Sequence, residues 1–525
     1  MQKHRDELYK TIWRAACELR GEVDGWDFKM YVLGFLFYRF LSENLTRHIN
    51  DKQREAGDSS FDYASLDDSL MEGENIDETI RMIVDDKGFF IRPSELFCNV
   101  LAKHKDDSTE LNQTLKAAFD NIVASTQGNK SEAVFKGLFN DIDVDSTKNL
   151  GDNIIRRNQK LYKVMNTIAS FKLEYGSSDG ANSIDIFGDA YEYLMRMYAS
   201  SAGKSGGEFF TPQEVSHLLA RLVSYGKDSV NKVYDPACGS GSLLLQFAKV
   251  LGGDKVKQGY YGQEINPTSY NLCRINMLLH NIGYEHFNIA LGDVLLNPKH
   301  WDCEPFDAIV SNPPYSTKWE GKSNPTLIND PRFAPAGVLA PESKADFAFT
   351  MHMLSWLSPQ GACAIVEFPG VLYRTGAERQ IRKYLADNNF IDTIIQLPAN
   401  LFYGNTIATC IIVLKKNKQD NNVLFIDASE LYTKITNKNR LDQEHIESIL
   451  QAYAKRENTE HFSTLASYED IVANDYNLSV QGFVAPKDTR EHINILELNA
   501  NIAQIVERQS ILRVQIDSIV SELGA

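Results

Sequence analysis

The chain has 525 residues, of which 43% are hydrophobic and 24% charged, and its formal net charge is −16. This length predicts two or three domains with sizeable cores. No apolar run is long enough to cross a membrane and no basic-then-apolar leader is found, so we expect neither membrane insertion nor secretion. The seven cysteines are scattered without a C-x-x-C pair, which favours reduced residues in an intracellular protein and no metal site.

The pattern along the chain predicts three parts. Residues 1–175 are expected to be mainly helical, with a buried apolar block at 30–41. Glycine and serine at 172–182 indicate a linker. Strands alternate with helices from about 185 to 425, which is typical of a doubly wound parallel sheet. We therefore expect a helical domain over 1–175, an α/β domain over 176–475 and a helical tail over 476–525.

The first candidate site segment in chain order consists of Glu208, Phe209, Phe210, Thr211, Pro212 and Gln213. It predicts a helix start, with Thr211 as the cap and Pro212 in the first turn. Such a start would also present backbone donors to a carboxylate. The nearby Gly203-Lys204-Ser205 is not a P-loop, because Tyr198 stands where that motif needs glycine.

Three successive predicted strands each end in an acid. Asp235 ends the first strand and is followed by a glycine-containing turn with Gly239, Ser240, Gly241 and Ser242. Such a turn lets a ligand approach the backbone closely. A nicotinamide cofactor is disfavoured because Leu244 replaces the third glycine of the dinucleotide fingerprint. Glu264 and Asp293 end the next two strands, and Glu264 follows Gly241 at close to the spacing of about 20 residues typical of ribose-binding acids.

Asn312-Pro313-Pro314-Tyr315 follows the apolar run 306–311. Alone, this tetrapeptide could be a proline-rich turn. After three strand-end acids, it instead indicates methyl transfer to a planar exocyclic nitrogen. The Asn312 side-chain oxygen and the Pro313 carbonyl would accept the amino hydrogens and localise the lone pair. The prolines would stiffen the turn, and Tyr315 would stack on an extruded base.

Two further segments have candidate roles. Residues 316–344 form a long irregular insertion, which predicts a lid over DNA, with Lys318, Lys322 and Arg332 either meeting phosphates or lying on the surface. At the C-terminus, apolar residues recur every three or four positions, with Gln509 interrupting, which predicts a coiled-coil seam over about four heptads. A surface helix packed on its own domain is the alternative. Asp488 or Thr489 is the predicted cap. The apolar residues are Ile495, Leu498, Ile502, Ile505, Leu512, Ile516, Ile519 and Leu523.

The order of these motifs resembles the class I S-adenosylmethionine (SAM)-dependent methyltransferases. Within them it resembles the N6-adenine DNA methyltransferases that are modification (M) subunits of type I restriction–modification systems. Residues 25–42, 185–194 and 475–479 also match this family's pattern. The resemblance implies a Rossmann-like α/β fold with a mostly parallel sheet and a final antiparallel hairpin, preceded by a helical domain and followed by a coiled-coil-like helix.

The resemblance also implies the roles of the candidate residues. SAM would be held by residues 208–213 and by Asp235, Gly239, Ser240, Gly241 and Ser242, with Glu264 at its ribose and Asp293 near its adenine. Asn312, Pro313, Pro314 and Tyr315 would be catalytic, with Phe402 as a second stacking face.

The acidic net charge argues against a protein that makes all its own phosphate contacts. We therefore expect another chain to choose the DNA sequence. The resemblance implies a specificity (S) subunit that binds the C-terminal helix, two M subunits per S subunit, a restriction (R) subunit in the full complex, and double-stranded DNA in a prokaryotic cytoplasm. The alternatives are a protein glutamine N5-methyltransferase, disfavoured by the large helical domain and the heptads, and a non-catalytic SAM-binding scaffold, disfavoured by the intact Asn312 and Tyr315.

Overall fold

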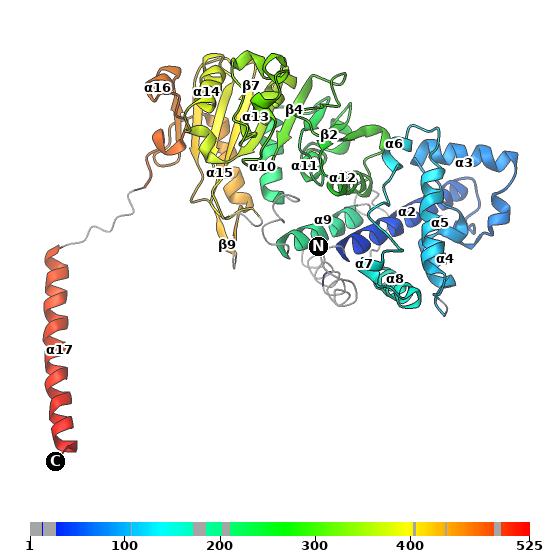
Figure 1. Ribbon diagram of the computed structural model, residues 1–525, viewed down its shortest axis with the longest axis horizontal. Coiled ribbons are helices and arrows are strands. Elements are labelled where there is room, and N and C mark those ends of the chain that lie inside the picture. The colour runs from blue at the N-terminus through cyan, green and yellow to red at the C-terminus, as the bar shows by residue number, and fades with distance from the viewer. Residues whose placement is uncertain are drawn as a thin grey trace. The chain divides into compact units, whose positions relative to one another are not determined.

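The computed structural model describes residues 13, 28–106, 108–171, 185–201, 211–402, 406–435, 438–487 and 495–524 (Figure 1). The described residues up to Val484 form one compact unit, and those from Ala485 onward form a second. The linker expected at 172–182, the candidate residues Glu208, Phe209 and Phe210, and the caps expected at Asp488 or Thr489 lie outside the described residues.

A single mixed sheet forms the centre of the first unit. Its strands are β1 (Val233–Asp235), β2 (Tyr260–Glu264), β3 (Phe287–Leu291), β4 (Phe306–Ser311), β5 (Leu357–Glu367), β6 (Ile391–Gln396), β7 (Cys410–Lys415), β8 (Val423–Asp427) and β11 (Ser463–Ala466). Their order is β11-β8-β6-β7-β5-β4-β1-β2-β3. The five strands β3, β2, β1, β4 and β5 are parallel, whereas β7 is antiparallel to both β5 and β6. The predicted α/β fold with an antiparallel final pair is therefore confirmed.

The sheet extends beyond that pair. β8 is parallel to β6, and β11 is antiparallel to β8. These outer strands were not part of the prediction. β11 is only partly buried and has no run of apolar residues, so its sequence carries little strand signal.

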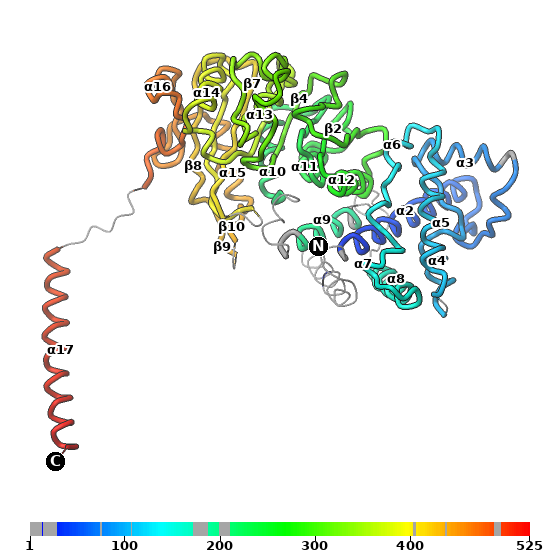
Figure 2. Tube along the Cα trace, viewed as in Figure 1, coloured from blue at the N-terminus to red at the C-terminus, as the bar shows by residue number. Residues whose placement is uncertain are grey.

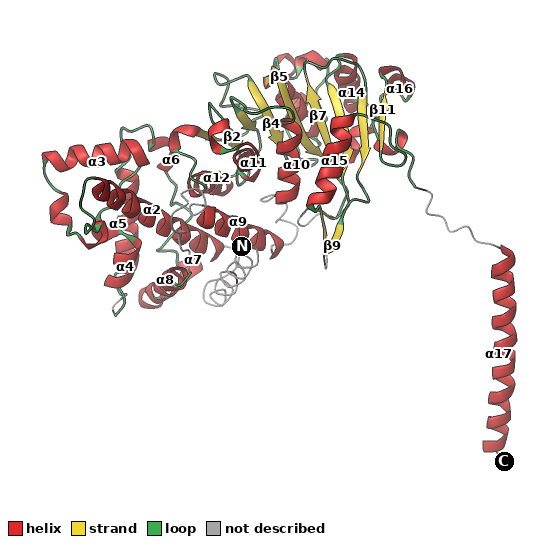
Figure 3. Cartoon of the chain, turned by 180° about the vertical axis from the view of Figure 1, so that it is seen from behind, coloured by secondary structure: helices red, strands yellow, loops and turns green. Residues whose placement is uncertain are grey.

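Helices cover both faces of the sheet (Figure 3). One face packs against α10 (Gln213–Val223), α11 (Ser242–Leu251), α12 (Pro267–Leu279) and α15 (Gln443–Lys455), and the other against α13 (Asp346–Trp356), α14 (Ala377–Asp387) and α16 (Tyr468–Ala473). Adjacent residues of β4 belong to opposite cores, with Ile309 facing the second set of helices and Val310 the first. This alternation is the period-two pattern of a strand buried on both sides.

The N-terminal region is helical, as predicted. Its helices are α2 (Phe28–Glu55), α3 (Glu74–Lys87), α4 (Phe97–Lys103), α5 (Leu111–Ala124), α6 (Glu132–Phe135), α7 (Thr147–Leu150) and α8 (Ile154–Ala169) (Figure 2). A further helix, α9 (Asp185–Ser201), packs with them but lies within the range predicted for the α/β domain. The hydrophobic residues of the block at 30–41 are buried, which confirms the expected core. The ring of Phe40 on α2 meets that of Phe187 on α9 at 5.6 Å. One hydrophobic core therefore runs from these helices to the sheet.

The insertion at 316–344 is a compact loop that is closed at its base. The Ala345 amide donates to the Thr317 carbonyl at 2.9 Å, and the Trp319 amide donates to the Glu342 carbonyl at 3.0 Å. Its Phe333 and Leu339 are buried in the core beside α13. Lys318 and Lys322 are exposed.

Both alternatives predicted for Arg332, a contact with phosphates and a place on the surface, are wrong. Its side chain is 1% exposed, and its guanidinium donates to the carbonyls of Val294 and Leu295 at 2.7 Å each and to the Asp330 carboxylate at 2.8 Å. These partners, two of them backbone carbonyls of a distant segment, leave no surface for a phosphate. Nothing in the sequence around Arg332 indicates these partners, because an arginine in a polar loop has the same local pattern whether it is buried or exposed.

The C-terminal unit contains α17 (Ile495–Leu523), the predicted tail helix. Every described residue of α17 is exposed, including its apolar seam. Among the described helices of the chain, none is long and apolar enough to cross a membrane.

Candidate active site

The parallel strands bring the predicted site residues to one edge of the sheet. Asp235 ends β1, Glu264 ends β2, Asp293 lies just beyond β3 and Asn312 follows β4. These four strands are neighbours in the order β4-β1-β2-β3. The chain proceeds from β1 to β3 at the margin of the sheet and then returns to the other side of β1 as β4, so the direction of strand order reverses between β1 and β4. Ligands of open α/β sheets bind at the carboxyl ends of the strands, at such a switch point. The topology therefore gathers the residues into one site.

Asp235 is a buried carboxyl at the floor of this site, with 1% of its surface exposed. Its Oδ1 accepts from the Ala237 amide and from the Ser311 hydroxyl, both at 2.9 Å. Its Oδ2 has no hydrogen-bond partner among the described residues. Burial, with a smaller contribution from the Glu264 charge, raises the pKa of Asp235 to about 7. The unpaired oxygen is therefore available to a polar or cationic ligand.

The turn after Asp235 combines close packing on one side with open space on the other. Gly239 and Gly241 have φ of +54° and +78°, values that favour glycine. A Cβ on Gly241 would lie 2.7 Å from Cys273 Sγ of α12, whereas one on Gly239 would meet nothing within 4 Å. Asn276 of α12 donates to the Ser240 carbonyl at 2.9 Å, and Ser242 begins α11. Helix packing thus fixes this turn and leaves its Gly239 side open.

Glu264 ties the ends of two turns together. Its carboxylate accepts from the Gly239 amide at 2.9 Å and from the Asn266 amide at 2.8 Å, while burial raises its pKa. The next residue, Ile265, is 65% exposed. Asp293 is held similarly, because its Oδ1 accepts from the Leu295 amide at 2.9 Å. The edge therefore offers fixed carboxylates beside an exposed apolar side chain.

The tetrapeptide is locked by its own hydrogen bonds. The Tyr315 hydroxyl donates to Asn312 Oδ1 at 2.5 Å, and Asn312 Nδ2 donates to the Thr211 hydroxyl at 3.0 Å. The Tyr315 ring stands edge-on to the ring of Phe402, with centroids 6.3 Å apart and an interplanar angle of 86°. Burial raises the pKa of Tyr315 well above its usual value, so the hydroxyl remains a donor. The structure thus places the predicted second aromatic, Phe402, beside Tyr315.

Thr211 does not cap a helix, so that prediction is wrong. α10 begins at Gln213 with Pro212 at the cap position and no side-chain cap bond. Thr211 therefore lies one residue too early, and its buried hydroxyl accepts from Asn312 instead. The Gln213 side chain donates to Glu192 of α9 at 2.7 Å. Thr211 and the first residue of α10 accordingly link the tetrapeptide to α9.

Two buried acids behind the tetrapeptide were missed by the sequence reasoning. Asp346 accepts from the Ser316 amide at 3.0 Å, and Ser316 has a strained φ of +50°. Glu367 ends β5, accepts from the Thr350 hydroxyl at 3.0 Å and is fully buried. Burial, followed by the Asp346 charge, raises its pKa well above the usual value. Asp346 and Glu367 each stand alone in an otherwise apolar segment, and this pattern could have indicated that both acids are buried.

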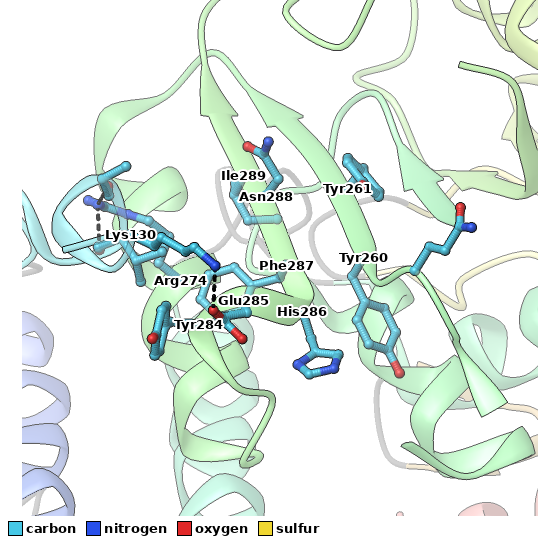
Figure 4. Close-up of a pocket in the computed structure, with 13 residues that line it drawn as sticks. Lys130, Tyr260, Tyr261, Arg274, Tyr284, Glu285, His286, Phe287, Asn288 and Ile289 are labelled. Atoms are coloured by element: carbon cyan, nitrogen blue, oxygen red, sulfur yellow. Dashed lines mark hydrogen bonds and ion pairs between the residues drawn. The ribbon is translucent and has the colours of Figure 1, made fainter. Parts of the chain in front are cut away.

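A separate pocket of about 480 Å³ lies at the opposite edge of the sheet (Figure 4). Tyr260 and Phe287, which begin β2 and β3, line it together with an ion pair between Lys130 and Glu285 at 3.2 Å. The amino ends of parallel strands lie away from Asn312. This pocket is therefore distinct from the candidate active site.

Comparisons with known proteins agree with this architecture. Residues 182–492 match the family model of N-6 DNA methylases, and residues 8–168 match that of the HsdM N-terminal domain. The chain is 46% identical to the type I restriction enzyme MpnII methylase subunit of Mycoplasma pneumoniae, over 100% of this chain and 98% of that protein. It is 34% identical to the MjaVII methylase subunit of Methanocaldococcus jannaschii over 64% of this chain and 58% of that protein.

A solved structure shows the same arrangement. The crystal structure of the type I restriction-modification system methyltransferase subunit from Streptococcus thermophilus superposes with a TM-score of 0.82 and 36% sequence identity, over 91% of this chain and 99% of that one. The family resemblance inferred from the motifs is thus confirmed. The chain belongs to the N-6 DNA methylase family of type I restriction–modification methyltransferase subunits.

Proposed function

We propose that the chain transfers a methyl group from SAM to N6 of adenine in DNA, as the modification subunit of a type I restriction–modification complex. The observation that carries this proposal is the tetrapeptide Asn312–Tyr315, locked by Thr211 at the edge where Asp235, Glu264 and Asp293 converge. We assign the methyltransferase part to residues 176–475, after a helical domain at 1–175 and before a tail at 476–525.

The residues at this edge fit SAM, which combines a cationic sulfonium, an adenosine and an amino-acid end. Glu264 offers a carboxylate for ribose hydroxyls beside the exposed Ile265, which suits an adenine face. Asp235 has an unpaired buried oxygen, and the Gly239 side of the turn is open. Asp293 would lie near the adenine, and residues 208–213 beside the amino-acid end. When bound, SAM supplies an electrophilic methyl group.

Asn312 and Pro313 would orient the nitrogen that accepts the methyl group. The Asn312 oxygen has two lone pairs, and the Tyr315 hydroxyl uses one of them. The second lone pair and the Pro313 carbonyl can accept the two amino hydrogens of adenine. Drawing both hydrogens to one side localises the nitrogen lone pair. Positioning in a site shielded from water then contributes more than acid–base groups do.

Tyr315 and Phe402 would hold the extruded base. Enzymes that modify a base take it out of the duplex and stack it on flat side chains. The edge-on contact with Phe402 fixes the Tyr315 ring, and the Tyr315 hydroxyl fixes Asn312. Pro314 is exposed, and Pro313 is buried beneath the turn. One small cluster would therefore both stack the base and orient its amino group.

The choice of target sequence is assigned to partner subunits. The net charge of −16 and the exposed apolar seam of α17 support binding to an S subunit. From the family we further propose two M subunits per S subunit and an R subunit in the full complex. A fold-level neighbour, with a TM-score of 0.61 and 20% identity, comes from work on complex assembly of the type I R-M system. We expect the complex to act on double-stranded DNA in a prokaryotic cytoplasm.

Transfer of labelled methyl groups tests this function. The chain would be assayed alone and with the S subunit, on duplex DNA and on a release-factor substrate that carries a glutamine acceptor. We expect label in DNA, and only with the S subunit. Label in the protein substrate would favour glutamine N5-methylation, and binding of SAM without transfer to either substrate would favour a scaffold.

A further inference from the structure

A two-stranded hairpin lies at the same edge of the sheet as the tetrapeptide. It pairs β9 (Thr433–Ile435) antiparallel with β10 (Lys438–Arg440) and belongs to no larger sheet within the described residues. The hairpin follows β8, which is parallel to β6 and therefore to β5 and β4. The carboxyl end of β8 thus lies at the edge where Asn312 follows β4. Figure 3 shows the hairpin projecting beyond the sheet.

We propose that this hairpin is a DNA-binding arm, whose exposed Lys434 contacts a phosphate beside the adenine that enters the active site. This inference rests on the proposed function, because it assigns part of the DNA contact to the M subunit itself.

The middle of β10 contacts the segment that carries the second stacking aromatic. The Asn439 amide donates to the Asn400 carbonyl at 3.0 Å, and Asn439 Nδ2 donates to the Ala399 carbonyl at 2.8 Å. Phe402, whose ring meets that of Tyr315, follows two residues after Asn400. A phosphate held by the hairpin would therefore lie near an extruded base.

An electrostatic interaction links β10, at its turn end, to the helix that follows the segment fixing Asn312. Lys438 is half-buried, and the charge of Glu214 in the first turn of α10 counteracts the lowering of its pKa by burial. That helix begins two residues after Thr211, the partner of Asn312. The Asn439 hydrogen bonds and this attraction thus relate the hairpin to two segments of the catalytic cluster.

The hairpin is locally basic in an acidic protein. Residues 432–440 contain Lys434, Lys438 and Arg440 and no acid, whereas the whole chain has a net charge of −16. Arg440 pairs with Asp442 at 2.6 Å, and Lys438 is half-buried within the electrostatic influence of Glu214. Lys434 is exposed and has no ion-pair partner among the described residues. A DNA-modifying protein with this net charge must meet phosphates at such local sites.

The shape and apolar side chains of the hairpin also suit DNA. A two-stranded ribbon fits the major groove, which is about 12 Å wide. Tyr432 and Ile435 are 37% and 39% exposed, so they add apolar contact area beside the cations. An isolated two-stranded hairpin is at best marginally stable in water. A role at the protein surface explains its presence better than a contribution to the core.

The salt dependence of DNA binding tests the arm. The complex with the S subunit would be titrated with target duplex over a range of salt concentrations, comparing wild type, Lys434→Gln and Lys434→Arg. Lys257→Gln is the matched control, because Lys257 is an exposed lysine just before β2, at the opposite edge of the sheet. Affinity falls with salt, and each lost phosphate contact makes the negative slope of log affinity against log salt less steep by about 0.9.

We expect Lys434→Gln to make that slope less steep by about 1 and to weaken binding to all sequences alike, and Lys434→Arg to restore both. The KM for DNA should rise while the rate at saturating DNA is unchanged. An unchanged slope in Lys434→Gln would overturn the proposal. If that variant instead lost binding to the S subunit, and the complex that still formed had the wild-type slope, the hairpin would be a protein-docking surface and the proposal would also be overturned. A wild-type complex with a Lys434-dependent slope but no methyl transfer would support the arm and refute the proposed function.

Discussion

Replacing Arg332 with methionine removes the cation that joins the insertion at 316–344 to the turn carrying Asp293. The buried guanidinium donates to the carbonyls of Val294 and Leu295 at 2.7 Å and to Asp330 at 2.8 to 3.2 Å. The side chain of methionine has a similar length but donates no hydrogen bond. The substitution therefore removes the guanidinium donor from the two backbone carbonyls and from the Asp330 carboxylate. The Asp330 side chain is only 15% exposed.

Removing one member of a buried ion pair costs about 3–5 kcal/mol, because the other charge stays buried and unpaired. Each hydrogen bond from a charged group contributes about 1.5–3 kcal/mol alone, but shared partners make these values non-additive. We therefore expect Arg332→Met to lower the free energy of unfolding by about 3–5 kcal/mol. The turn at 293–297 should loosen, so SAM affinity should fall more than the rate at saturating SAM.

Urea unfolding and calorimetric titration with SAM measure the two effects. The double variant Asp330→Asn with Arg332→Met should be more stable than the single Arg332→Met variant, because the unpaired carboxylate is removed. Arg54→Met is the control, since that arginine is largely exposed and surface pairs contribute about 0–1 kcal/mol. An Arg332→Met protein within about 0.5 kcal/mol of wild type and with unchanged SAM affinity would refute the reasoning.

Four further outcomes follow from the site and the tail. Glu264→Gln should weaken SAM binding in calorimetry about tenfold to a hundredfold, as expected for losing a charged hydrogen-bond acceptor, and leave DNA binding unchanged. The pKa of Asp235 is about 7 in the folded protein, against 3.8 for the ordinary carboxyl of the unfolded chain. The free energy of unfolding should therefore fall as the pH rises from about 4 to about 7, and it should fall less in Asp235→Asn. Tyr315→Phe should slow methyl transfer about tenfold by freeing Asn312, and Tyr315→Ala should lose about 1–3 kcal/mol of base stacking besides, seen as a higher KM for DNA. Deleting residues 495–525 should abolish co-purification with the S subunit while SAM binding persists; retained co-purification would contradict the role of α17.

The edge of the sheet that carries the site was predictable from the sequence because parallel strands repeat one local pattern. Each apolar run ends in a polar residue at its carboxyl end, and parallel pairing sends all such ends to one edge. Asp235, Glu264 and Asn312 follow this rule, so three local patterns were enough to assemble the site. The buried helix at 30–41 was predictable for a similar reason, because a run that is apolar all round must be covered.

The remaining features depend on contacts between distant segments. Thr211 and Asn312 are separated by 101 positions, and nothing local to Thr211 distinguishes a helix cap from a partner for an amide. Arg332 binds backbone carbonyls 37 and 38 positions away, and a backbone carbonyl has no residue type to recognise. Ion pairs and carbonyl contacts of this kind are set by packing, so periodicity cannot predict them.

Formation of N6-methyladenine in duplex DNA tests the central claim most directly. The complex with the S subunit would be incubated with SAM, and the nucleosides quantified by mass spectrometry for wild type, Asn312→Ala and the control Asn417→Ala, an exposed asparagine beyond β7 at the opposite edge of the sheet. We predict N6-methyladenine with wild type and Asn417→Ala, and none with Asn312→Ala although that variant still binds SAM. N6-methyladenine made by Asn312→Ala, or none made by wild type, would contradict the account.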